Sequence, residues 1–105
     1  MIGIGKWRGN IKSKFFTGSV DFEIIDNNGQ YAFDIELPDK FKNMQFRYYD
    51  IVEKGNTLTC KGKCSLVPRL TVNAELKFSG DSADIKLTAP PMPGAIKIKD
   101  ALKIG

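Results

Sequence analysis

Hydrophobic residues recur at every second position in eight separate segments of this chain, and this alternation restricts the fold more than any other feature. In residues 30–37, for example, Tyr31, Phe33, Ile35 and Leu37 alternate with polar residues or alanine. Successive side chains of a β-strand point to opposite faces of the sheet, so the pattern predicts antiparallel strands with one buried face. No segment keeps the helical period over three turns. We therefore expect an all-β protein.

The predicted strands are short and are separated by turns and loops. They cover approximately residues 5–13, 19–25, 31–37, 45–53, 57–66, 70–78, 83–87 and 95–104. Tight turns are expected at 26–29, 53–56 and 79–82, where Asn and Gly tolerate a positive φ. The alternation changes parity within residues 48–51, which predicts a bulge or a strand end there.

The second half of the chain repeats the first half in the same order. The spacing between matched residues drifts only from about 53 to 50, which favours a duplication with halves at approximately 5–55 and 58–105. Amphipathic strands also resemble one another through alternation alone. The matched segments are Trp7-Arg8-Gly9 with Cys60-Lys61-Gly62, 19–24 with 71–76, 33–37 with 83–87, and Asp50 and Gly55 with Asp100 and Gly105.

Eight strands in two equivalent halves most simply close into an eight-stranded antiparallel up-and-down β-barrel, because closure removes exposed sheet edges. In such a barrel the last strand pairs with the first. An open sandwich of two sheets is the alternative architecture. The 105 residues fit a single domain in either case.

The pair Gly5 and Trp7, at the head of the first strand of an eight-stranded meander, resembles the calycins: lipocalins, fatty-acid-binding proteins and avidins. The resemblance implies that Trp7 seals one end of the barrel against a basic residue of the last strand. Lys97, Lys99 and Lys103 are the candidates for that residue, although parity directs Lys97 and Lys99 outward.

The repeat also predicts what fills the barrel. It places Trp7, Phe22 and Phe33 of the first half opposite Cys60, Ala74 and Ala83 of the second half. Large residues opposite small ones either pack a dry interior or leave a one-sided pocket, and an eight-stranded barrel is wide enough for one small ligand. If a pocket is present, the residues expected to bind the ligand are Phe22, Tyr31, Phe33, Phe46 and Tyr48.

The loops opposite the tight turns combine apolar and basic residues. Such a rim suits an anionic amphiphile, an acidic protein partner, a second copy of the chain or an anionic membrane surface. The alternative is that the apolar side chains cap the core while the basic ones are merely solvated. The candidate rim residues are Phe16, Phe41, Val67, Met92, Lys14, Lys42 and Arg69.

Catalytic and metal chemistry find little support in the sequence. The chain contains no histidine, which excludes Ser-His-Asp and Cys-His arrangements and weakens any metal site. Cys60 and Cys64 lie four residues apart in a predicted strand, so their Cα atoms are about 13 Å apart, beyond disulfide reach. We expect two free, buried thiols, no catalytic residue, no metal and no cofactor.

These observations lead to one main hypothesis and one alternative. The main hypothesis is a small non-enzymatic binding protein whose calycin-like barrel holds an apolar or anionic amphiphilic small molecule. The alternative is a filled barrel that acts as a protein–protein interaction or assembly domain through its loop end. The net charge of +4 is too small and unclustered to predict nucleic-acid binding. Free thiols, no membrane span and no signal peptide predict a cytoplasmic protein.

Overall fold

The computed structural model describes residues 1–12, 17–36, 46–65, 67–90 and 94–105, and the side chains of 67 and 68 are not described. The described residues form eight strands and no helix. The strands are β1 (Gly5–Lys12), β2 (Thr17–Asn27), β3 (Gln30–Glu36), β4 (Phe46–Lys54), β5 (Thr57–Cys64), β6 (Val67–Ser79), β7 (Ser82–Thr88) and β8 (Ala95–Lys103).

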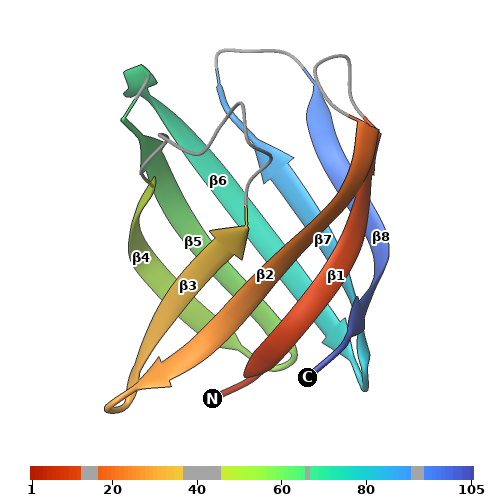
Figure 1. Ribbon diagram of the computed structural model, residues 1–105. Helices are drawn as coiled ribbons and strands as arrows, with labels where there is room; N and C mark the ends of the chain where they lie inside the picture. Colours follow the sequence, from red (N-terminus) through yellow and green to blue (C-terminus); the bar gives the residue numbers. More distant parts are fainter. Residues whose placement is uncertain (13–16, 37–45, 66, 91–93) are drawn as a thin grey trace.

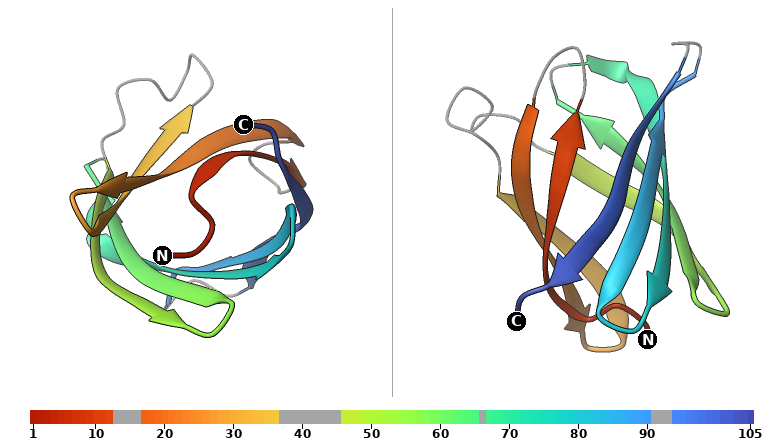
Figure 2. Two further views of the ribbon diagram at one scale, coloured as in Figure 1. Left: turned by 90° about the horizontal axis from the view of Figure 1, so that it is seen from below. Right: turned by 90° about the vertical axis from the view of Figure 1, so that its right-hand side faces the viewer.

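A single antiparallel sheet contains all eight strands, in the order β3-β2-β1-β8-β7-β6-β5-β4. The sheet curls into a nearly closed barrel, seen from the side in Figure 1 and from below in Figure 2. The last strand pairs with the first, with Trp7 opposite Lys103 and Arg8 opposite Leu102. This arrangement confirms the up-and-down order expected from the sequence and excludes the two-sheet sandwich.

The barrel is not closed by hydrogen bonds on all sides, which corrects the expectation of complete closure. β3 and β4 are the two outer strands of the sheet, and within the described residues they do not pair. Side chains bridge the opening instead. The Tyr31 hydroxyl donates a hydrogen bond to the Glu53 carboxylate, and the rings of Phe33 and Tyr48 lie 5.1 Å apart. We call this opening the β3–β4 seam.

Bulges occur in β4 and β8, at the positions that the repeat aligns. In β4, the four residues from Tyr49 to Val52 oppose the three residues from Lys61 to Thr59 of β5, which confirms the bulge expected near residues 48–51. In β8, Ile98 to Ala101 oppose only Ile85 to Ala83 of β7. Asp50 and Asp100 occupy the two bulges with φ of 50° and 56°.

Each bulge reverses the parity of the strand that follows it. In β8 the extra residue turns Ala101 into the core, where it is completely buried, although strict alternation from Ile98 places Asp100 inward. The same reversal leaves Val52 and Leu102 with their side chains 55% and 57% exposed. A one-residue insertion is therefore sufficient to exchange the two faces of a strand.

The tight-turn end of the barrel is sealed by the N-terminal segment, which crosses the opening from below (Figure 2). Trp7 is fully buried, packs on Phe78 with a ring distance of 5.3 Å, and donates its indole N–H to the Gly3 carbonyl at 2.8 Å. The backbone N–H of Ile2 donates to the Tyr31 hydroxyl at 2.7 Å. Trp7 thus lies where the sequence predicted a seal.

Lys103 is the last-strand lysine that the register places opposite Trp7. Its side chain runs along Gly5 and is exposed, and the described contacts of the indole are with Phe78 and Gly3. The basic partner implied by the calycin resemblance is therefore close in register, but an aromatic ring and a backbone carbonyl hold the indole.

Candidate ligand-binding site

Burial of the inward-facing side chains falls along the barrel from the tight turns toward the loops. Four register partners, one on each of β5 to β8, form a completely enclosed row: Leu58, Leu76, Ile85 and Ile98. In the next row toward the loops Cys60 is buried, but Ala74, Leu87 and Ile96 are only half-buried. The inner face of the loop-end half is therefore less completely covered on β6 to β8, whereas Cys60, Gly62 and Cys64 of β5 remain buried.

The opposite wall of the barrel shows the same change. Ile24 of β2 is buried, whereas the next two inward residues toward the loop end, Phe22 and Val20, are half-buried. Phe22 lies between Trp7 of β1 and Ile35 of β3 in the register, and Ile35 is also half-buried. Apolar side chains at interior positions thus remain incompletely covered on both walls.

Four of the five residues predicted to bind a ligand are joined by ring contacts around the β3–β4 seam. Tyr31 and Phe33 stack at 6.4 Å, Phe33 tilts against Tyr48 at 5.1 Å, and Tyr48 stacks on Phe46 at 6.3 Å. All four are half-buried. We call this group the seam aromatics. Phe22, the fifth predicted residue, is on β2 and is not part of the ring contacts described.

The ring of Tyr48 packs over Gly62 on the neighbouring strand. A Cβ at Gly62 would be 3.7 Å from Cδ1 of Tyr48, its register partner on β4, so the ring lies directly over the glycine. Burial raises the pKa of the Tyr48 hydroxyl, and the negative charges of Asp34 and of Cys60, when its thiol is ionised, raise it further. Burial also raises the pKa of the Cys60 thiol to about 11. Both groups are therefore neutral at physiological pH.

The two cysteines lie on the inner side of β5 and are free, as the sequence predicted. Cys60 is opposite Ala74 in the register, and Cys64 is opposite Phe46 on the other neighbouring strand. Both thiols thus lie in the loop-end half of the barrel, where they are nevertheless buried. Among the described residues no group of His, Cys, Asp or Glu is arranged to hold a metal ion.

Most of the predicted rim residues lie outside the described residues. This applies to Phe16, Phe41, Met92, Lys14 and Lys42, and for Val67 only the backbone is described, in β6. Arg69, also in β6, is exposed. Arg69 is therefore the candidate rim residue whose side chain the structure describes.

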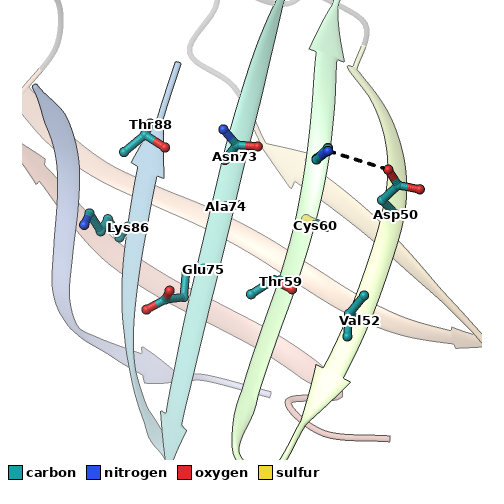
Figure 3. A pocket seen from close by; sticks show the side chains of 10 residues that line it. Asp50, Val52, Thr59, Cys60, Asn73, Ala74, Glu75, Lys86 and Thr88 are labelled. Carbon is teal, nitrogen blue, oxygen red and sulfur yellow. Dashed lines mark ion pairs between the residues drawn. The ribbon is translucent and has the colours of Figure 1, made fainter. Parts of the chain in front are cut away.

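Two grooves lie on the outer face of the sheet and not in its interior. One, of about 380 Å³, crosses β4 to β7 and is shown in Figure 3. Most of its lining side chains are polar, and Lys61 and Asp50 within it form an ion pair at 3.8 Å. The second, of about 240 Å³, crosses β1 to β3 and carries Asp21, Glu23 and Glu36. Both have the character of solvated, charge-paired strand faces.

Sequence reasoning placed several accessible interior residues on the correct face without identifying them as site candidates. Val72, Leu87 and Ile96 are half-buried neighbours of the candidate site. Their alternation showed that they face inward, but it contains no information about their distance from the open end. The positions of the loops in the sequence could have indicated which residues lie near the open end, because Val72, Leu87 and Ile96 are each closer in sequence to a loop than to a tight turn.

Comparisons with known proteins give no relative for this chain: no protein-family model, no curated protein and no solved structure matches it. Within the described residues, no helix is long and apolar enough to cross a membrane. The strand order is consistent with a calycin-like fold, and the coarser statement that the structure supports is a nearly closed, eight-stranded antiparallel barrel.

Proposed function

We propose that this chain is a small non-enzymatic protein that binds an apolar or amphiphilic small molecule in the loop-end half of its barrel. The observation that supports this proposal is the step in burial between the enclosed row at Leu58 and Ile85 and the half-buried row at Ala74 and Leu87. Covering apolar surface contributes about 25 cal/mol per Å², so a ligand seated against the second row would gain free energy.

The interior chemistry restricts the part of the ligand that would be enclosed. Among the described inward residues of this half, the polar groups are the Tyr48 hydroxyl and the Cys60 and Cys64 thiols, and the raised pKa values of Tyr48 and Cys60 keep both neutral. An enclosed ligand charge would therefore lack a counter-ion and would be costly to bury. The enclosed part is thus uncharged, and any anionic head group lies at the loop end, on the same side as Arg69.

A matched pair of substitutions tests whether the space is open. Ala74 is half-buried in the accessible row, whereas Ala83 is only 2% exposed in the packed end of the barrel. We expect Ala74→Phe to fold with nearly unchanged stability and to abolish binding, because the added ring occupies the ligand's place. Ala83→Phe is expected to destabilise by about 1–3 kcal/mol through overpacking.

Binding is measured with the fluorescent dye 1-anilinonaphthalene-8-sulfonate and with a saturated fatty acid, and native mass spectrometry of the purified protein detects any co-purified molecule. Near-ultraviolet circular dichroism shows that each variant keeps its tertiary packing. If Ala74→Phe destabilises as much as Ala83→Phe, the interior is filled and the alternative, an interaction domain, is favoured. If the wild-type protein binds neither the dye nor the fatty acid and contains no co-purified molecule, the proposal is wrong.

A further inference from the structure

The proposed small-molecule site uses side chains of β3 but not the backbone groups along its edge, which pair with no other strand within the described residues. The strands that the repeat makes equivalent to β3 and β4 are β7 and β8, and these pair from Ser82 to Thr88. β3 and β4 do not pair within the described residues. The pairing that joins β7 to β8 in the second half is therefore missing between the equivalent strands of the first half, as far as the described residues show.

β3 has backbone groups available along this edge. Asn28 and Gly29, both with positive φ, form a two-residue hairpin turn, in which the flanking pair Asn27 and Gln30 is hydrogen-bonded. Along a strand, the backbone N–H and C=O groups of successive residues point to opposite edges. Those of Gln30, Ala32, Asp34 and Glu36 therefore point toward β2. The N–H and C=O groups of Tyr31, Phe33 and Ile35 face the β3–β4 seam.

The edge lacks proline, a bulge and basic residues, and its charged residues are the acidic pair Asp34 and Glu36. Proteins normally protect a free edge with proline, lysine, a bulge or a short strand. β3 contains seven residues with the sequence QYAFDIE, without proline, lysine, arginine or a bulge, whereas β4 contains both a bulge and Arg47. The contacts from β4 to this edge are made by side chains, at Tyr48 and Glu53.

The side chains of β3 define the chemistry of a strand that would fit this edge. Its outward residues Asp34 and Glu36 are exposed, and neither β2 nor β3 contains a lysine or arginine. Its inward residues Phe33 and Ile35 are half-buried and apolar. A complementary strand would therefore alternate aliphatic residues toward the interior with basic residues toward solvent.

The second half of the chain contains such a strand as an internal template. β8 presents Ile96, Lys97 and Ile98 to Leu87, Lys86 and Ile85 of β7. In this pairing, two lysines are directly opposite each other, which is unfavourable. On β3 the repeat places Glu36 where β7 has Lys86, so a lysine of the same incoming strand would meet an opposite charge.

We propose that the free edge of β3 binds, by strand addition, an extended segment of a partner protein in which aliphatic and basic residues alternate. The segment lies along Phe33 to Glu36, with its backbone on the seam-facing groups and its basic side chains opposite Asp34 and Glu36. This interaction involves a protein segment and not a small molecule, and it adjoins the small-molecule site at Phe33, whose ring belongs to the seam aromatics. A second copy of the chain is a poorer occupant, because β3 paired antiparallel with another β3 would bring acidic residues together.

The test uses a synthetic peptide with the sequence of residues 95–103, Ala-Ile-Lys-Ile-Lys-Asp-Ala-Leu-Lys, with both ends blocked. Its binding to the full chain is followed by fluorescence anisotropy at low and high salt. We expect saturable binding that weakens with salt, no comparable binding of a peptide of the same composition with the alternation broken, and none of a peptide with its first two lysines replaced by glutamate.

Two variants of the chain locate the binding surface. Asp34→Lys combined with Glu36→Lys is expected to reduce affinity by about tenfold or more, the size expected for two reversed cross-strand charge pairs. Glu75→Lys combined with Asp81→Lys, which makes the same charge change on β6 and in the turn after it, away from β3, serves as the matched control and should leave affinity nearly unchanged. Ile35→Pro removes one seam-facing donor and should also abolish binding.

Several results would overturn the proposal. These are absence of peptide binding at millimolar concentration, equal binding of the peptide with broken alternation, equal losses in the charge variant and its control, or binding that survives in folded Ile35→Pro. Sedimentation without peptide provides a further check. Self-association that Ile35→Pro abolishes would show that a second copy occupies the edge, and would contradict the partner proposed.

Discussion

Gly9 and Gly62 occupy equivalent positions of the repeat, yet the structure predicts opposite effects for the same substitution at the two sites. A Cβ at Gly9 would be 2.5 Å from Cγ2 of Ile98 and 3.4 Å from Cβ of Ala101. At Gly62 the nearest atoms would be at 3.7 Å, an ordinary contact. Neither glycine has a positive φ, so the difference is one of space and not of backbone conformation.

The size of the effect follows from how little room Ile98 has to move. Carbon atoms in contact prefer about 3.5–4.0 Å, so the side chain of Ile98 must retreat by about 1 Å to accept a methyl group on residue 9. Ile98 is 5% exposed in the enclosed row with Ile85. Overpacking of this kind costs about 1–3 kcal/mol. At Gly62, alanine should be neutral or stabilise by about 0.5–1 kcal/mol, since glycine weakens strand interiors.

Urea unfolding followed by far-ultraviolet circular dichroism measures both variants. We expect the midpoint to fall for Gly9→Ala and to stay constant or rise for Gly62→Ala, with unchanged m-values. Adding Ile98→Leu to Gly9→Ala removes the colliding Cγ2 methyl and should recover part of the loss. The packing argument is wrong if the two alanine variants are equally stable, or if Ile98→Leu adds its own cost without any recovery.

Three further predictions concern the seal, a buried thiol and a bulge. Trp7→Phe loses the hydrogen bond to Gly3 and leaves a void, so thermal unfolding should show destabilisation of about 1–3 kcal/mol; an unchanged midpoint would contradict a sealing role. The pKa of the Cys60 thiol in the folded state, about 11, exceeds its ordinary value of 9.0. The contribution of the neutral, buried thiol to the stability of the folded state is therefore complete below pH 9 and is lost as the pH rises through 11. Wild type should therefore lose stability relative to Cys60→Ala between pH 9 and 11 in urea titrations, and parallel curves would refute this reasoning. Asp100, with φ of 56°, should tolerate glycine in a thermal melt but lose about 1–2 kcal/mol when replaced by valine; equal stabilities of the two variants would exclude conformational strain as the cause.

The general fold could be predicted because its causes are local. Alternation identifies strands, and short turns such as Asn28-Gly29 force sequential strands to pair, which together leave few topologies. The bulge at Asp100 was not predicted from the sequence, because it depends on a backbone conformation that aspartate tolerates but that the pattern of residues does not reveal. The β3–β4 seam was missed because residues 31–37 and 45–53 have the same alternation as 83–87 and 95–104.

The candidate site was predicted only in part, for a similar reason. Parity correctly directed Phe33, Phe46 and Tyr48 inward, and the curvature of the sheet then brought their rings together. The extent to which each side chain is covered depends on its height in the barrel and on the seal formed by Trp7 and Gly3. These are properties of the assembled barrel, and the sequence pattern of a single strand does not contain them.

The order of strands in the sheet has a consequence for how the chain is connected. Each neighbouring pair in the sheet is also consecutive in sequence, except β1 and β8, which join the two ends of the chain. The Gly105 carbonyl already accepts a hydrogen bond from the Lys6 N–H at 3.1 Å. A circular permutant that links residue 105 to residue 1 and is cut within 37–45 would therefore run as one continuous meander from β4 to β3. Every strand pair would become local, and such a chain should fold faster than the natural order, in which the ladder between β1 and β8 must close nearly the whole chain.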